Sequence, residues 1–241
     1  MTARRARPHW VRRLLGIVAI VLLVWLVWEA ATWPDVRALA TRPPATTAFI
    51  ERYKQREREA GRTPRLEWRW VPSSVISIHL KRAVLVAEDV SFFRHHGFAP
   101  GNIREAMTEA IEERKIPRGA STITQQLAKN LWLSPSRNPL RKGREGVLTW
   151  QLERALSKRR ILECYLNVVE FGPGVYGAEA ASRRYFGKSA AELSEDDAAQ
   201  LAASLPRPRA WHPGVKTPSY RRYVENIRRR MDRAEVPGRL L

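Results

Sequence analysis

Three segments of the chain combine carboxylates with cationic and polar side chains at close spacing. The first reads Glu-Asp-Val-Ser-Phe-Phe-Arg-His-His-Gly over residues 88–97, and Glu88 stands at the end of an apolar stretch. A carboxylate there can point from a hydrophobic core into a cleft, where partial desolvation raises its pKa and suits it to general acid or base catalysis. The local sequence alone favours the plainer alternative, in which Glu88 is either solvated or paired with Arg94.

The second segment carries a set of uncharged polar residues that is unusual for a surface helix. Helical spacing aligns its hydroxyl, amide and ammonium donors along one face, and a pyrophosphate and a sugar require such donors. A solvated helix surface is the alternative, although Glu and Lys have the better propensity there, and the residues themselves leave both interpretations open. The members of this face are Ser121, Thr122, Gln125, Gln126, Lys129 and Asn130.

The third segment extends the positive charge. Arg137, Arg141 and Lys142 follow Lys129 within one short region, and Glu145 comes next. Grouped cations suit a phosphate-bearing ligand, whereas a run of charge is usually a solvated face. The spacing alone therefore indicates an anion site without excluding a bare surface.

Composition limits the classes of protein to consider. The chain has 241 residues, of which 44% are hydrophobic and 28% charged, so it can form one sizeable core together with an anchor and is not a disordered tail. The formal net charge of +19 predicts an anionic partner: nucleic acid, anionic lipid or a phosphorylated substrate. The single cysteine, Cys164, excludes an intrachain disulfide and a cysteine-based zinc cluster.

An apolar run near the N-terminus is long enough to cross a bilayer. Residues 14–33 supply the roughly 20 positions that a membrane-spanning helix needs, and only arginines among charged residues precede them. The positive-inside bias places the N-terminus in the cytoplasm and the rest of the chain outside, which favours a lipid over nucleic acid as the anionic partner. A cleaved signal peptide with a site at Ala38-Leu39-Ala40 is the alternative, but that site lies unusually far behind the apolar run.

The remaining sequence predicts a mainly α domain without an internal repeat or βαβ alternation. We expect a helix over Phe49–Glu59, a short extended segment around Trp68–Trp70 and a helix from Ser77 to Glu88. Glycines and prolines separate the later helical stretches. These are Ile103–Arg114, Thr122–Leu133, Pro139–Ser157, Arg159–Val168, Val175–Phe186, Ser194–Leu205 and Ser219–Ala234.

Four motifs resemble, in order, those of the peptidoglycan glycosyltransferase family (glycosyltransferase family 51). They are Glu-Asp-x-x-Phe-x-x-His-x-Gly, Gly-x-Ser-Thr-Ile-x-Gln-Gln-Leu-x-Lys-Asn, Arg-Lys-x-x-Glu and Lys-x-x-Ile-Leu-Glu-x-Tyr-Leu-Asn. The resemblance runs from about Trp68 to about Pro213. From the short stretch that follows the motifs, up to Leu241, we expect no transpeptidase domain of the kind found in bifunctional relatives, and the resemblance is to monofunctional members.

The resemblance implies a mainly α, lysozyme-like domain with a small membrane-proximal jaw lobe, preceded by one N-terminal transmembrane helix. We expect a cytoplasmic basic arm over residues 1–13, the transmembrane helix over 14–33, a juxtamembrane linker over 34–66 and the glycosyltransferase domain over 67–241.

The resemblance also assigns roles by motif position. Glu88 matches the general base and Glu145 the second essential glutamate, while Lys129 and Arg137 match residues that bind the diphosphate of the donor. The matching cleft residues with positioning roles are Ser121, Gln125, Gln126, Asn130, Arg141 and Lys142.

The implied reaction is the polymerisation of lipid II into β-1,4 glycan strands by inverting displacement of polyprenyl diphosphate. Glu145 either orients the cations or assists the leaving group with a divalent cation, Mg²⁺ or Mn²⁺, and no other cofactor is expected. The expected location is the bacterial inner membrane, single-pass, with a periplasmic catalytic domain. The expected partners are the membrane, lipid II, the lipid-linked glycan strand and cell-wall synthesis proteins, but no nucleic acid.

Two alternatives to synthesis stay open. A lytic enzyme on the same fold needs one acidic glutamate but no cation cluster for a diphosphate, so the residues from Gln125 to Asn130 favour synthesis. A non-enzymatic, basic membrane scaffold fits the composition and the anchor, but it does not explain four ordered motifs.

Overall fold

The computed structural model describes residues 9–99, 121–136, 138–234 and 238. The helix expected over Ile103–Arg114 and the candidate residue Arg137 lie outside the described residues. The chain divides into two compact units, Met1–Asp35 and Val36–Leu241, and each is described by itself.

The first unit contains one long helix, α1 (His9–Ala31). Its side chains from Leu14 to Trp28 are apolar and exposed, and it is long and apolar enough to cross a membrane. The predicted membrane-spanning helix over 14–33 is therefore confirmed as a helix, which begins earlier than expected and ends at Ala31.

The second unit begins with the 3₁₀ helix η1 (Val36–Ala40) and the helix α2 (Ala48–Glu59). The Thr47 side chain caps α2 by accepting a hydrogen bond from the Ile50 N–H at 3.1 Å. Ile50 is fully buried against residues far along the chain, including Tyr176. The segment predicted as a linker over 34–66 therefore contains a packed helix, and the compact unit starts at Val36, not at residue 67.

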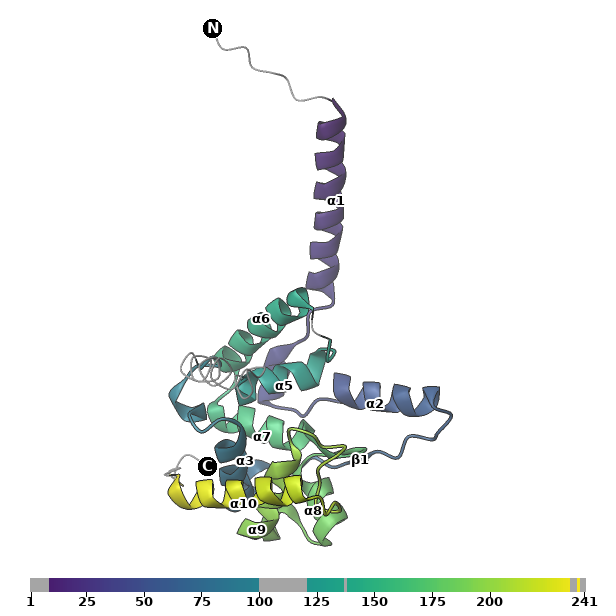
Figure 1. Cartoon of the computed structure of the whole chain (residues 1–241). Helices are drawn as coiled ribbons and strands as arrows, with labels where there is room; N and C mark the ends of the chain where they lie inside the picture. The colour runs from purple at the N-terminus through teal and green to yellow at the C-terminus, as the bar shows by residue number, and fades with distance from the viewer. Residues whose placement is uncertain (1–8, 100–120, 137, 235–237, 239–241) are drawn as a thin grey trace. The chain divides into compact units, whose positions relative to one another are not determined.

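Within the described residues, seven further helices belong to this unit, and all but α8 pack in two groups (Figure 1). Several of these helices are capped at the N-terminus by a side chain that accepts a backbone hydrogen bond. The capping residues include Ser77, Thr122, Asn138 and Ser157. One group places α3 on α9 and α10, and the other places α5 on α6, α7 and α2. The helices are α3 (Ile78–Glu88), α5 (Ile123–Trp132), α6 (Pro139–Ala155), α7 (Lys158–Val168), α8 (Ala178–Phe186), α9 (Glu195–Ser204) and α10 (Pro218–Arg233).

A small sheet joins the beginning and the middle of the unit. Its strands are β1 (Glu67–Trp68), β2 (Glu170–Gly172) and β3 (Val175–Tyr176), in the order β1-β3-β2, with β1 parallel and β2 antiparallel to β3. Gly174 at the β2–β3 turn has a positive φ of 76°, and a Cβ there would lie 2.5 Å from the Arg65 carbonyl oxygen. The backbone of this turn therefore fits only glycine.

The mainly α prediction is confirmed, and most of the expected helices are correct within a few residues. The helix expected over Val175–Phe186 was wrong at its start, because Val175 and Tyr176 form β3 and the helix begins only after Gly177, whose φ is 82°. The remaining short elements are the 3₁₀ helices η2 (Ser73–Val75), η3 (Phe92–Arg94) and η4 (Ala190–Glu192).

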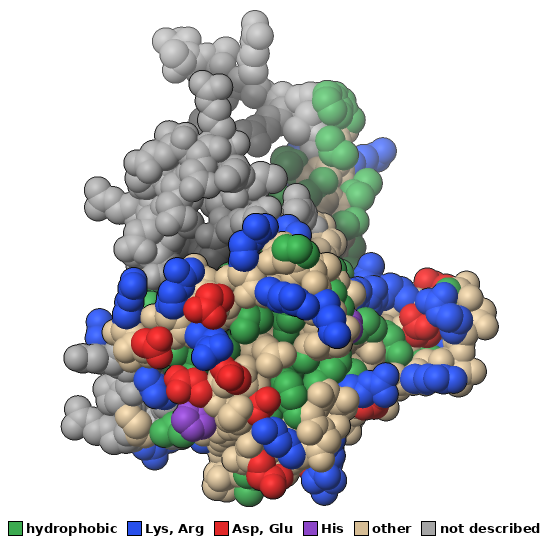
Figure 2. All heavy atoms as spheres, turned by 60° about the horizontal axis from the view of Figure 1, so that its bottom comes forward, with side chains coloured by type: hydrophobic (Ala, Val, Ile, Leu, Met, Phe, Trp, Pro, Cys, Tyr) green, Lys and Arg blue, Asp and Glu red, His purple; other side chains and the backbone are tan. Residues whose placement is uncertain are grey.

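On the one face drawn in Figure 2, the positive charge does not gather in a single patch. On the face shown in Figure 2, Lys and Arg side chains alternate with Asp and Glu side chains. Two ion pairs of the α8–α10 region illustrate this mixture: Lys188 to Asp197 at 2.5 Å and Arg228 to Asp196 at 3.0 Å. The net charge therefore does not locate a site, and the pocket must be found from its geometry.

Candidate active site

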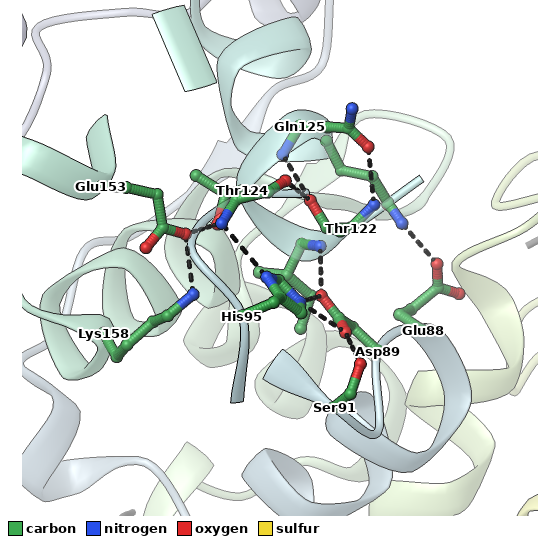
Figure 3. Close-up of polar contacts among 12 residues, drawn as sticks. Glu88, Asp89, Ser91, His95, Thr122, Thr124, Gln125, Glu153 and Lys158 are labelled. Carbon is green, nitrogen blue, oxygen red and sulfur yellow. Dashed lines mark hydrogen bonds and ion pairs between the residues drawn. The ribbon is translucent and has the colours of Figure 1, made fainter. Parts of the chain in front are cut away.

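Glu88 is the last residue of α3, and the preceding turns of this helix are buried. Its Oε2 accepts a hydrogen bond of 2.7 Å from Nε2 of Gln126 on α5. Figure 3 shows the Glu88 carboxylate turned toward α5. The end of one packed helix and the side of another therefore meet at this carboxylate.

The pKa of Glu88 lies above its ordinary value. Burial is the main cause, because it disfavours the charged carboxylate, and the negative charge of Asp89 acts in the same direction. The hydrogen bond from Gln126 and the positive charges of Lys129 and Arg230 oppose the shift. A raised pKa brings this carboxylate nearer to the range in which a general base works at neutral pH.

The neighbouring Asp89 fixes the position of α5 relative to α3. Its Oδ2 accepts a hydrogen bond of 3.0 Å from the backbone N–H of Ile123, in the first turn of α5, and both carboxylate oxygens lie 3.0 Å from His95 Nε2. Nδ1 of His95 accepts a bond from the Gly97 N–H at 3.1 Å, so the tautomer that satisfies both contacts carries its proton on Nε2. These contacts, drawn in Figure 3, brace the site without entering the pocket.

Contacts at the start of α5 complete this brace. Thr122 and Gln125 form a capping box, in which the Thr122 side chain accepts from the Gln125 N–H and Gln125 Oε1 accepts from the Thr122 N–H at 3.0 Å. Thr124 donates to Glu153 on α6 at 2.5 Å, and Lys158 on α7 donates to the same oxygen at 2.8 Å (Figure 3). The start of α5 is thus bonded directly to Asp89 and Glu153, and Lys158 holds Glu153 in turn.

A pocket of about 110 Å³ opens between α5 and α6. All the residues that line it belong to the polar and cationic sets predicted from the sequence, together with the second motif glutamate. The lining residues are Ser121, Gln125, Gln126, Lys129, Arg141, Lys142 and Glu145.

Lys129 brings an ammonium group into this pocket from α5. Burial lowers its pKa, and the cations Arg141 and Lys142 act in the same direction, while Glu145 and Glu88 oppose the shift. Among the residues that the structure describes, no carboxylate forms an ion pair with Lys129. Its charge is therefore available to an anionic ligand.

Glu145 faces the same pocket from α6 and is clamped by two cations. Its side chain is only 4% exposed, and Arg141 Nη1 donates to Oε2 at 2.6 Å. Lys142 Nζ donates to the other carboxylate oxygen. The spacings of three and four residues place all three side chains on one side of the helix.

The structure separates two of the predicted residues from the pocket lining. Asn130 is buried, and its amide donates to the Gln126 carbonyl oxygen one turn earlier at 2.7 Å. Glu88 lies beside the pocket and is joined to it through Gln126, which bonds Glu88 and lines the pocket.

Sequence reasoning missed Tyr165 on α7 as a site residue. This side chain is fully buried, and its hydroxyl donates to Oε1 of Gln126 at 2.9 Å. Its place in the fourth motif was the available signal, because a phenol inside an otherwise aliphatic helix face requires a buried partner.

The described residues do not form a ready site for a divalent cation. Within them, no group of three or more His, Cys, Asp or Glu side chains is arranged to hold a metal ion. Glu145 is the one carboxylate in the described pocket lining, and both of its oxygens are occupied by Arg141 and Lys142. A metal ion at Glu145 would have to displace these cations.

A buried carboxylate beside a cation-lined pocket, on a mainly helical domain, suits an enzyme that transfers a group from an anionic leaving group. Comparison with known proteins makes this class specific. Residues 56–233 match the sequence model of the transglycosylase family, so the chain belongs to that family of glycosyltransferases. The family resemblance of the four motifs is thereby confirmed.

Relatives of similar length agree with this assignment. A biosynthetic peptidoglycan transglycosylase of Thiobacillus denitrificans is 47% identical, over 91% of this chain and 93% of its own. Proteins of the same name from Bordetella avium and an Azoarcus species are 42% and 45% identical, over 98% and 95% of this chain and 100% and 97% of their own. The chain is thus similar to these enzymes over nearly their whole length.

Proposed function

We propose that this protein is a peptidoglycan glycosyltransferase that polymerises lipid II into β-1,4 glycan strands. The names of its relatives and its family support glycan polymerisation. The observation that carries the proposal is the arrangement at the pocket, where Gln126 joins a carboxylate with a raised pKa to a cavity that contains the Lys129 ammonium group. A base and a cation at adjacent positions are what displacement of a diphosphate by a sugar hydroxyl requires.

In this mechanism Glu88 acts as the general base. It takes the proton from the 4-hydroxyl of the acceptor N-acetylglucosamine while that oxygen bonds to the anomeric carbon of the donor. The bond from this carbon to the diphosphate oxygen breaks, and the polyprenyl diphosphate leaves with the electron pair. One displacement converts an α-linked diphosphate into a β-1,4 linkage, so the configuration is inverted.

The cations of the pocket stabilise the leaving group. Negative charge grows on the departing diphosphate, and a preorganised cation in a site that excludes water lowers the energy of that transition state. Lys129 has this role among the described residues, and we propose Arg137 as a second diphosphate ligand from its motif position. Glu145 holds Arg141 and Lys142 in place at the edge of the same pocket.

We also propose that α1 anchors the enzyme in the inner membrane, with the N-terminus in the cytoplasm and the catalytic domain in the periplasm. The residues before α1 include arginines but no acidic residue, and this excess of positive charge supports the orientation. The Ala38-Leu39-Ala40 segment lies in η1, where Leu39 is buried and its carbonyl oxygen accepts from Arg160 at 2.7 Å. Such packing favours a retained anchor, which keeps the enzyme with its lipid-linked substrates.

Incubation of the purified full-length protein in detergent or bilayers with labelled lipid II tests the proposal. We expect a ladder of glycan products on a gel, inhibited by moenomycin, an inhibitor expected from the family resemblance. A parallel incubation with purified sacculi tests the lytic alternative. Release of sugar fragments from sacculi, together with no ladder from lipid II, would reject synthesis.

A further inference from the structure

The amide of Gln126 connects two groups that come from different helices. On one side Oε1 accepts a hydrogen bond of 2.9 Å from the Tyr165 hydroxyl of α7. On the other side Nε2 donates to Glu88 Oε2 of α3 at 2.7 Å. A single side chain of α5 therefore links a buried phenol to the proposed base.

The orientation of this amide determines whether a hydrogen-bond donor or an acceptor faces the Glu88 carboxylate. With Nε2 toward the carboxylate, an N–H donor stabilises the ionised form of Glu88. With the amide rotated by half a turn, Oε1 would face the carboxylate, and two acceptors would repel each other. The amide oxygen and the amide nitrogen of Gln126 are attached to the same terminal carbon. The position of the Gln126 backbone therefore does not determine which of the two faces Glu88.

The hydrogen bond from Tyr165 determines the orientation of the Gln126 amide. The Tyr165 side chain is fully buried, so the hydroxyl proton needs an acceptor, and leaving it without one would destabilise the folded protein. Within the described part of the chain, that acceptor is Oε1 of Gln126. Burial and the negative charges of Glu88 and Asp89 raise the pKa of Tyr165 well above its ordinary value, so the phenol keeps its proton and acts as the donor.

We propose that Tyr165 is a positioning residue, whose hydroxyl fixes the Gln126 amide so that this amide holds Glu88 as an ionised base beside the pocket. The backbone of Gln126 is held as well, because the Asn130 amide donates to its carbonyl oxygen at 2.7 Å. This inference rests on the proposed role of Glu88 in the reaction. It adds a residue that does not touch the substrate and acts only through Gln126.

Removing one oxygen atom tests the idea. Tyr165→Phe frees the amide to rotate, so Glu88 loses a fixed donor and binds its proton more tightly. We expect its pKa to rise by about one unit, because a hydrogen bond to a charged group is worth roughly that much. The carboxyl ¹³C resonance of Glu88, assigned by its loss in Glu88→Gln, reports this shift in the full-length enzyme without substrate.

Turnover provides a second readout. The acid limb of the pH profile of lipid II polymerisation should move to higher pH by the same amount in Tyr165→Phe. A shift of one unit lowers kcat about fivefold at the original midpoint of that limb and about tenfold well below it. KM should change little, because Tyr165 does not contact the substrate. A purely structural role would reduce the yield or thermal stability but would leave the limb in place.

Two further variants separate these outcomes. Gln126→Met removes the amide at similar length and should raise the Glu88 pKa to a similar extent, and adding Tyr165→Phe to it should cause no further shift. Tyr220→Phe is the matched control, since this phenol is also buried, at 3% exposure, and donates to the Gln200 carbonyl oxygen at 2.9 Å outside the pocket. It should leave the Glu88 pKa unchanged.

An unchanged Glu88 pKa in folded Tyr165→Phe, or an equal further shift in the Gln126→Met background, would overturn the inference. The proposed function fails differently, through absence of glycan products from the unmodified enzyme. The ¹³C titration needs no turnover, so the link between Tyr165 and Glu88 is decided independently of the reaction.

Discussion

Glu88 and Glu145 both lie near the part of α5 that carries Gln126 and Lys129, and they are held by different kinds of partner. Glu88 accepts from an uncharged amide at 2.7 Å, and burial raises its pKa. Glu145 accepts from a guanidinium at 2.6 Å and from the Lys142 ammonium group. One carboxylate is therefore free to gain a proton, and the other is committed to two positive charges.

This difference in partners suits the two carboxylates to different functions, one to proton transfer and the other to holding cations in place. A general base must change its protonation state during turnover, so a neutral partner that leaves room for a proton suits it. A carboxylate bonded to two cations keeps those cations at fixed positions, which suits electrostatic stabilisation of a leaving group. We therefore propose that the same residue type serves two roles here because its surroundings differ, and variants of each carboxylate test one half of that comparison.

The largest expected effect is at Glu88. Glu88→Gln keeps the size of the side chain but removes the base, so glycan synthesis should fall by about 10²–10⁴-fold while lipid II still binds. Gel analysis of labelled lipid II products gives the rate, and retention on lipid II vesicles gives the binding. Glu170→Gln is the matched control, because this carboxylate is also buried but does not line the pocket. Near-normal synthesis by Glu88→Gln would remove Glu88 as the base.

Lys129→Ala should have the next largest effect. Loss of one preorganised charge at a leaving group costs about 10²–10³-fold in rate, and here the loss should appear mainly in kcat. Single-turnover measurements with labelled lipid II separate this from weaker binding. Lys188→Ala removes a lysine that is paired with Asp197 outside the pocket and should leave turnover unchanged. Equal turnover by both variants would exclude Lys129 as a diphosphate ligand.

The sequence predicted the components of the pocket well because they follow one helical repeat. On α5, Lys129 follows Gln125 by four positions and Gln126 by three, and on α6 Glu145 follows Arg141 by four. A polar face could therefore be inferred before any contact was known. The α class and most helix bounds followed from the same periodicity and from the caps.

Contacts between distant segments could not be inferred in this way. Tyr165 reaches Gln126 across 39 positions of sequence, and Asn130 turns to the backbone of its own helix. The short strands around Gly174 carry no alternating pattern long enough to detect, since their pairing depends on segments about 100 residues apart. Packing of the α2 segment likewise depends on Tyr176, which is remote in sequence.

Glu145→Gln tests the other half of the comparison. The amide keeps the shape but loses the charge that holds Arg141 and Lys142, so we expect a loss of about 1–3 kcal/mol in stability, because these cations are partly solvated. Turnover should fall by about tenfold as the cations lose their fixed positions.

Thermal unfolding and lipid II turnover, measured on the same preparations, check both parts. Glu179→Gln is the matched control, because this buried carboxylate pairs with Arg183 at 2.6 Å and accepts from the Ala190 N–H at 2.8 Å, away from the pocket. It should lose stability but not turnover. A Glu145→Gln enzyme that is destabilised yet fully active would limit Glu145 to a structural role.

The smallest expected effect concerns Glu170, which shows that a raised pKa alone does not make a base. Burial raises the pKa of this carboxyl from 4.5 to about 7, with Arg56 and the Gly174 backbone opposing the shift. Between these two values the native state binds more protons than the unfolded chain, so the stability contributed by Glu170 falls as pH rises and stays low above pH 7. Glu170→Gln lacks this penalty.

We therefore expect Glu170→Gln to be about 2 kcal/mol more stable than the unmodified protein at pH 8 and nearly equal to it at pH 5. Urea unfolding at both pH values measures the difference. If the variant were instead less stable at pH 8, the contact of 3.7 Å between Arg209 and Glu170 would be a stabilising ion pair. Glu170 would then resemble Glu145, and Glu88 would stand apart as the buried carboxylate whose partner is an amide.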